Sequence, residues 1–193
     1  MKRIIIAHGW GGSPDESMLK WIRESMESEG CEVIAPLMPH PDTPTIEDWV
    51  PALGNSVGLP DEDTYFVGHS VGCQTTLRYI ATLPENIKIG GILLIAPWFV
   101  FTLESLDDGE SPDIATPWLK TPISFNHIRI HTDKIAGIFS DNDPYVLLTE
   151  NKILLEKELN AETITLHERG HFTGLDNVRE LPEALDVLRE MMK

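Results

Sequence analysis

The sequence predicts an α/β fold with a mostly parallel sheet of about six strands and helices on both of its faces. Two observations support this prediction. Short apolar runs of strand length alternate with amphipathic segments of helix length about six times along the chain. The run at residues 89–96 is apolar throughout, as expected for a parallel strand that is buried on both faces.

The first half of the chain supplies three of these strands and the helices between them. Ser13 is predicted to cap the first helix, with Pro14 at its first position and Glu16 completing a capping box. Gly30 is placed to end that helix, and Thr45 is placed to cap the second. The predicted strands are residues 4–7, 31–36 and 64–67.

The second half continues the alternation, with one interruption. The predicted strands are residues 89–96, 134–140 and 162–166, and the predicted helices are residues 73–81, 145–159 and 181–191. Residues 97–127 carry four prolines, Pro97, Pro112, Pro117 and Pro122, and no clear periodicity. A connection this long in a compact domain is usually functional, so we expect a small, irregular, cap-like cover. We expect residues 1–193 to form a single domain.

The composition excludes several classes of protein. The chain has 193 residues, with 15 lysines and arginines against 31 acidic residues, and a formal net charge of −16. Binding to nucleic acid or to an anionic membrane needs cations, so we expect neither partner. The chain has only two cysteines, no signal-peptide pattern and no apolar run of about 20 residues. We therefore expect a cytoplasmic protein with reduced thiols.

The segment Gly68-His69-Ser70-Val71-Gly72 indicates a catalytic serine. It has the pattern G-x-S-x-G, follows a predicted strand and opens a predicted helix, which is the setting of a nucleophile elbow. Such a sharp reversal strains the serine backbone, and the two glycines remove Cβ atoms that would collide with the neighbouring strand and helix. We expect Ser70 to be a nucleophile and the Val71 N–H to point at a developing oxyanion.

A serine nucleophile needs a base, and the base needs an acid, which this kind of fold supplies from loops after later strands. Asp141 and Asp143 follow the next-to-last predicted strand, and both are candidates for the acid. His167 and His171 follow the last predicted strand, and His171 is the expected base. The two histidines are four residues apart, but a metal pair at that spacing needs a helix, so we expect no metal site.

Two other segments complete the predicted site. Residues 8–12 form a glycine-rich loop after the first strand, and the Trp10 N–H is the natural second donor to an oxyanion. Trp98, Phe99 and Trp118 lie in the long connection and are candidate apolar walls of a substrate pocket, with core packing as the alternative.

These segments together resemble the small serine hydrolases of the retinoblastoma-binding-protein-9 and YdeN type, a compact branch of the α/β-hydrolase superfamily. The resemblance spans nearly the whole chain. It implies Ser70 as nucleophile, Asp143 as acid and His171 as base, in a cofactor-free hydrolase without a large cap. It rests on His8–Gly12, Met38-Pro39, Glu47-Asp48-Trp49, Gly68–Gly72, Asp143-Pro144 and Gly170-His171-Phe172.

One family feature is absent from the sequence. The retinoblastoma-binding motif L-x-C-x-E has no match here, because Cys31-Glu32 follows Ser-Glu-Gly at residues 28–30 and lacks the leucine. The resemblance therefore implies no such protein partner. The sequence makes no prediction about the oligomeric state.

The sequence as a whole predicts a hydrolase that cleaves carboxyl esters of small molecules, or amides or thioesters, through a Ser-His-Asp triad. A binding protein that keeps this fold and performs little chemistry is the alternative. The ordered occurrence of serine, acid and histidine favours the enzyme, because a binding protein has no use for all three.

Overall fold

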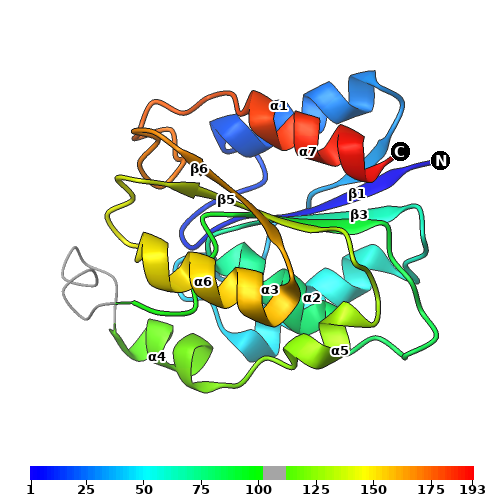
Figure 1. The fold of residues 1–193 in the computed structure, drawn as a ribbon, viewed down its shortest axis with the longest axis horizontal. Coiled ribbons are helices and arrows are strands. Elements are labelled where there is room, and N and C mark those ends of the chain that lie inside the picture. Colours follow the sequence, from blue (N-terminus) through cyan, green and yellow to red (C-terminus); the bar gives the residue numbers. More distant parts are fainter. Residues whose placement is uncertain (102–111) are drawn as a thin grey trace.

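Six parallel strands form one sheet in the order β2-β1-β3-β4-β5-β6. The structure is a computed structural model, and it describes residues 1–101 and 112–193 (Figure 1). The prediction of a parallel sheet with helices on both faces is confirmed. The strands are β1 (Arg3–Ala7), β2 (Glu32–Ile34), β3 (Thr64–His69), β4 (Gly91–Ile95), β5 (Ile135–Ser140) and β6 (Glu162–Leu166).

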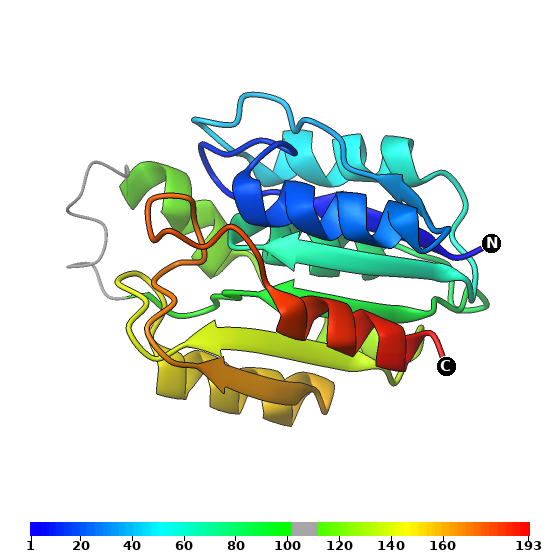
Figure 2. The ribbon, with the colours of Figure 1, turned by 90° about the horizontal axis from the view of Figure 1, so that it is seen from above.

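Helices cover both faces of this sheet. Helices α1 (Ser17–Ser28) and α7 (Pro182–Met191) lie side by side on one face (Figure 2). Helices α2 (Ile46–Val57), α3 (Val71–Ile80) and α6 (Leu148–Leu159) lie on the other face (Figure 1). Every residue of β3, β4 and β5 is buried, as expected for strands covered on two sides.

The strand order places the loops that follow β1 and β3 beside each other. Strand β1 pairs with both β2 and β3, so the chain changes direction across the sheet at β1. Ala7 at the end of β1 is in register with Gly68 in β3, two residues before Ser70. Ligands of open α/β sheets bind at such a switch point, outside the carboxyl ends of the strands.

The first helix begins later than the sequence predicts. It starts at Ser17, and the Ser13 hydroxyl oxygen accepts a hydrogen bond from the Asp15 N–H instead of capping a helix at Pro14. Glu16 occupies the N-cap position but makes no side-chain capping hydrogen bond, and its Oε2 lies 3.7 Å from Nδ1 of His69. The predicted cap of the second helix is confirmed, since Thr45 accepts a hydrogen bond from the Asp48 N–H.

The connection 97–127 is less irregular than the sequence predicts, because it contains α4 (Pro112–Lys120) and the first residues of α5 (Phe125–Arg129). Pro112 opens α4, where its missing N–H costs no hydrogen bond. The Arg78 guanidinium fastens the segment by donating to the carbonyl oxygens of Trp118 and Thr121. Residues 102–111, which belong to the predicted cap-like connection, lie outside the described residues.

None of the helices within residues 1–101 and 112–193 is both long enough and apolar enough to cross a lipid bilayer.

Candidate active site

Ser70 lies at the sharp turn between β3 and α3, in a strained backbone conformation. Its φ of 56° and ψ of −122° put it in a region that residues with a side chain seldom adopt. A Cβ atom on Gly68 would lie 2.6 Å from the Cα of Cys73, and a Cβ on Gly72 would collide with the carbonyl oxygen of Ala7. The two glycines of the motif are therefore required by close backbone contacts.

A chain of hydrogen bonds runs from Ser70 to a buried carboxylate. The Ser70 Oγ lies 2.9 Å from Nε2 of His171, and Nδ1 of His171 lies 2.8 Å from Oδ2 of Asp143. A carboxylate only accepts, so Nδ1 carries the proton of the neutral ring. Nε2 is then the bare nitrogen that faces the serine hydroxyl, which is the arrangement a general base needs.

Asp143 rather than Asp141 faces His171. The Asp143 side chain is 2% exposed, and its second oxygen accepts hydrogen bonds from the backbone N–H groups of Tyr145 and Val146. Asp141 lies on the surface, and its Oδ2 is 2.6 Å from Nδ1 of His167. His167 and His171, which are four residues apart, thus face different carboxylates.

The loop that carries His171 is held by contacts from two directions. The Asp176 Oδ2 accepts hydrogen bonds from the N–H of His171 and from both the N–H and the hydroxyl of Thr173. His69 donates from Nε2 to the carbonyl oxygen of His171 over 2.8 Å. Gly170 has a φ of +54°, and a Cβ there would collide with Asp176, so the loop needs glycine.

The loop after β1 borders the site through Gly9, Trp10 and Gly11. Nδ1 of His8 lies 2.8 Å from the Gly9 carbonyl oxygen, and its Nε2 accepts from the N–H of Met38, so this histidine fixes the shape of the loop. The Trp10 N–H has no hydrogen-bond partner among the described residues. Val71 opens α3, where N–H groups lack an intrahelical acceptor.

Ser70 and His171 open into a cavity of about 460 Å³.

This cavity is bounded by the loops that follow β1, β3, β5 and β6. The lining residues are Gly9, Trp10, Gly11, Glu16, His69, Ser70, Pro144, Tyr145, His171, Thr173, Gly174, Leu175 and Asp176. The sequence predicted Trp10 here but missed Tyr145 and Leu175, which come from loops whose positions depend on the sheet.

The structure places the three predicted apolar walls elsewhere, which corrects that prediction. Trp98 and Trp118 are each 1% exposed and belong to the core, and the Trp118 indole N–H donates to the Pro44 carbonyl oxygen. Phe99 is half-buried and packs its ring against Phe125. None of the three lines the cavity at Ser70. The core-packing alternative is therefore the right one for the two tryptophans.

Two titratable side chains of the site were not predicted as part of it. His69 is buried, and burial lowers the pKa of its ring to about 4, with the nearby His171 acting in the same direction. Burial also raises the pKa of the Glu16 carboxyl. His69 stands inside the G-x-S-x-G motif, where its side chain gives no separate signal, and Glu16 was assigned to a capping box.

Cys73, three residues after Ser70, is a core residue. Its side chain is fully buried, and its thiol donates to the carbonyl oxygens of Gly68 and Ile95. Burial raises the pKa of this thiol, which keeps it protonated and unreactive.

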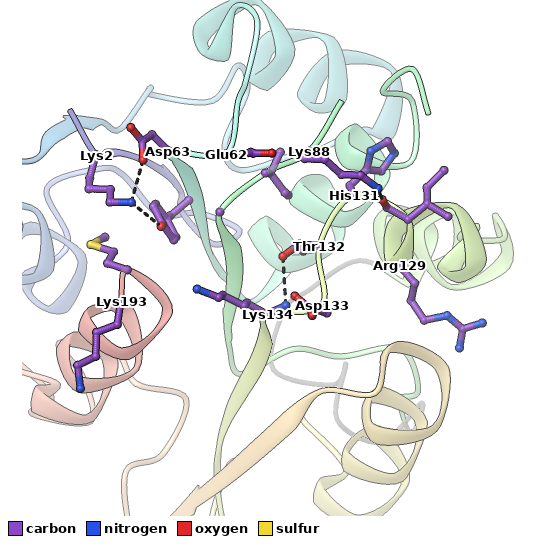
Figure 3. Close-up of a pocket in the computed structure, with 15 residues that line it drawn as sticks. Lys2, Glu62, Asp63, Lys88, Arg129, His131, Thr132, Asp133, Lys134 and Lys193 are labelled. Carbon is purple, nitrogen blue, oxygen red and sulfur yellow. Dashed lines mark hydrogen bonds and ion pairs between the residues drawn. The ribbon is translucent and has the colours of Figure 1, made fainter. Parts of the chain in front are cut away.

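A second cavity, of 560 Å³, lies at the opposite edge of the sheet, where the strands begin (Figure 3). Several cations line it, but they do not converge. Lys2 points to Asp63 and Tyr65, while Arg129 and Lys193 point away from the other labelled side chains (Figure 3). The Lys88 ammonium is bound to the carbonyl oxygen of Ile130. This arrangement does not form an anion site.

Comparisons with known proteins show a family and a fold for this chain. A family model described as serine hydrolase matches residues 4–190. YdeN of Bacillus subtilis (strain 168) is 27% identical over 190 residues, covering 97% of this chain and 94% of YdeN. The serine hydrolase RBBP9 of Rattus norvegicus is 24% identical over 189 residues, covering 97% of this chain and 89% of that protein.

Solved structures show the same fold. The crystal structure of the ydeN gene product from B. subtilis matches with a TM-score of 0.89 at 26% identity, covering 99% of this chain and 98% of the other. A carboxylesterase structure from the thaumarchaeon Nitrososphaera gargenis matches with a TM-score of 0.72 at 14% identity. The match covers 99% of this chain and 89% of the carboxylesterase chain. At that identity the second similarity shows the fold alone.

Proposed function

This chain belongs to the serine hydrolase family, and we propose that it hydrolyses carboxyl esters of small substrates through an acyl-enzyme formed on Ser70. The observation that carries the proposal is the hydrogen-bonded chain from Ser70 through His171 to Asp143, with distances of 2.9 and 2.8 Å. Hydrolysis of amides and thioesters would proceed through the same acyl-enzyme on Ser70.

In the first step, the Ser70 oxygen attacks the substrate carbonyl carbon while Nε2 of His171 takes the hydroxyl proton. The imidazolium that forms is stabilised by Asp143, which also holds the ring in the tautomer with its bare nitrogen toward the serine. The N–H groups of Val71 and Trp10 are the proposed donors to the oxyanion.

In the second half of the reaction, His171 gives its proton to the leaving group as the carbon–oxygen bond breaks. Water then enters, His171 takes a proton from it, and the hydroxide attacks the acyl carbon. The acyl group leaves as a carboxylic acid, and the proton returns to Ser70.

The site also supports the proposal through its surroundings. Asp143 is nearly inaccessible, and three of its hydrogen bonds come from protein groups, so its position is fixed before a substrate arrives. A preorganised acid and base lower the barrier without reorganisation during the reaction. A binding protein has no need of a strained serine aligned with such a pair.

The test is a screen of p-nitrophenyl esters, thioesters and amides with the wild type and with Ser70→Ala. We expect hydrolysis of at least one ester that Ser70→Ala loses. If no substrate is turned over and serine-directed probes do not react, the binding-protein alternative replaces the enzyme.

A further inference from the structure

Glu16 brings an unpaired carboxylate into the cavity at Ser70. Its side chain is 30% exposed, and its Oε2 lies 3.7 Å from Nδ1 of His69, beyond hydrogen-bond distance. None of the described residues that line this cavity is lysine or arginine. A carboxylate held in a cleft without a cation is a candidate for binding a ligand.

His69 does not supply the missing positive charge. Its Nε2 carries the proton that is donated to the His171 carbonyl oxygen, so Nδ1 of the neutral ring is bare. Burial keeps the pKa of this ring at about 4, so the ring is neutral near pH 7. Oε2 of an ionised Glu16 and Nδ1 of His69 both present lone pairs, which agrees with a separation beyond hydrogen-bond distance.

The carboxylate lies against the loop that carries a proposed oxyanion donor. A Cβ atom on Gly12 would lie 2.7 Å from Oε1 of Glu16, and a Cβ on Gly9 would lie 3.3 Å from the Cβ of Ser70. Glu16 and Ser70 therefore flank one short loop. A negative charge in this place opposes the negative charge that develops on the oxyanion, unless a cation neutralises it.

The other carboxylate of the cavity already binds neighbouring protein groups through its Oδ2. Asp176 accepts three hydrogen bonds from His171 and Thr173, so it is committed to the shape of the loop. Glu16 is the carboxylate that remains available to a substrate.

We propose that Glu16 is a specificity-determining residue that binds a cationic group of the substrate, which makes ammonium-bearing esters the preferred substrate class. This inference rests on the proposed function of Ser70. The bound cation cancels the charge of Glu16 during oxyanion formation, so it favours the transition state as well as binding. The net charge of −16 also attracts cationic substrates to the molecule.

The experiment compares esters that differ only in charge. Choline butyrate and neohexyl butyrate place a quaternary nitrogen or a quaternary carbon in the alcohol. The p-nitrophenyl ester of γ-trimethylammoniobutyrate and its carbon isostere place the same difference in the acyl group. The ratio of kcat/KM for the cationic and the neutral ester is measured in wild type and in Glu16→Gln.

We expect this ratio to fall about tenfold in Glu16→Gln for at least one pair. The neutral ester is hydrolysed at least as fast by the variant as by wild type. The matched control is Glu27→Gln, which removes the same charge from an exposed position on α1 and leaves the ratio unchanged. In wild type the ratio falls toward that of the variant in about 1 M salt, where the Debye length is about 3 Å.

Two outcomes distinguish failure of the Glu16 proposal from failure of the proposed function. Unchanged ratios in both pairs, with neutral esters still hydrolysed in a Ser70-dependent way, overturn the role of Glu16 and leave the proposed function intact. If no ester shows Ser70-dependent hydrolysis, the proposed function is overturned and the role of Glu16 falls with it.

Discussion

His69 donates a hydrogen bond from Nε2 to the carbonyl oxygen of His171 over 2.8 Å, joining residues 102 positions apart in the chain. His69, which directly precedes Ser70, thereby holds the loop that carries His171, and the ring of His171 faces Ser70. The two rings also pack together, with centroids 5.2 Å apart. The turn after β3 and the loop after β6 are thus coupled directly.

The buried ring of His69 predicts a pH dependence of stability. Its pKa falls from 6.5 to about 4 on folding, so between these values the unfolded chain binds more protons than the folded protein. The contribution of His69 is complete above pH 6.5 and is lost as the pH falls toward 4, by about 3 kcal/mol. Urea unfolding across this range measures the loss, which His69→Gln should reduce while keeping a donor to His171. Equal pH dependence in both proteins contradicts the prediction.

Ser70 should react covalently with a fluorophosphonate probe, because a serine activated by a base attacks phosphorus readily. Ser70→Ala should abolish the labelling and lower hydrolysis by several orders of magnitude. Mass spectrometry of the labelled peptide identifies the site. A label on another serine would refute the assignment.

Asp143→Asn should cost far more activity than Asp141→Asn. An amide at residue 143 neither stabilises the imidazolium nor holds the His171 tautomer, and such a change costs about 10⁴-fold in serine proteases. Asp141→Asn alters only an exposed contact with His167. The measurement is kcat for both variants with one ester, and a larger loss in Asp141→Asn would reverse the assignment.

Gly72→Ala should destabilise the fold by about 3 kcal/mol, because the new methyl group meets the backbone of Ala7 and His8 at the end of β1. Gly174→Ala is the matched control, since its Cβ would find its nearest neighbour at 3.6 Å. Thermal and urea unfolding of both variants give the comparison. A Gly72→Ala variant as stable as wild type would show that the backbone can shift there.

The cavity should favour short acyl chains. Each methylene that a cavity buries contributes about 0.8 kcal/mol, so selectivity should stop rising once the chain extends beyond it. The measurement is kcat/KM for p-nitrophenyl esters from acetate to palmitate. A steady rise through the longest chains would instead indicate a deep channel.

Much of the fold could be predicted because its signals are local. The six strands are apolar runs bounded by turn residues, and the motif around Ser70 is a steric pattern within five residues. The capping box at Ser13 also fits a local pattern, but it was wrong, because the helix begins only at Ser17 and Glu16 faces His69, which is far away in the chain. Residues 97–127 hid two helices because prolines obscure their periodicity.

The sequence by itself determined which residue types are present and the order in which strands present them, including Ser70, the two aspartates and His171. Only the tertiary structure decided that Asp143 faces His171, that Glu16 enters the cavity and that Trp98 and Trp118 enter the core. The physical reason is that turns and strands follow from steric and apolar patterns among neighbours. A site, in contrast, is assembled from loops that meet only through the pairing of distant strands.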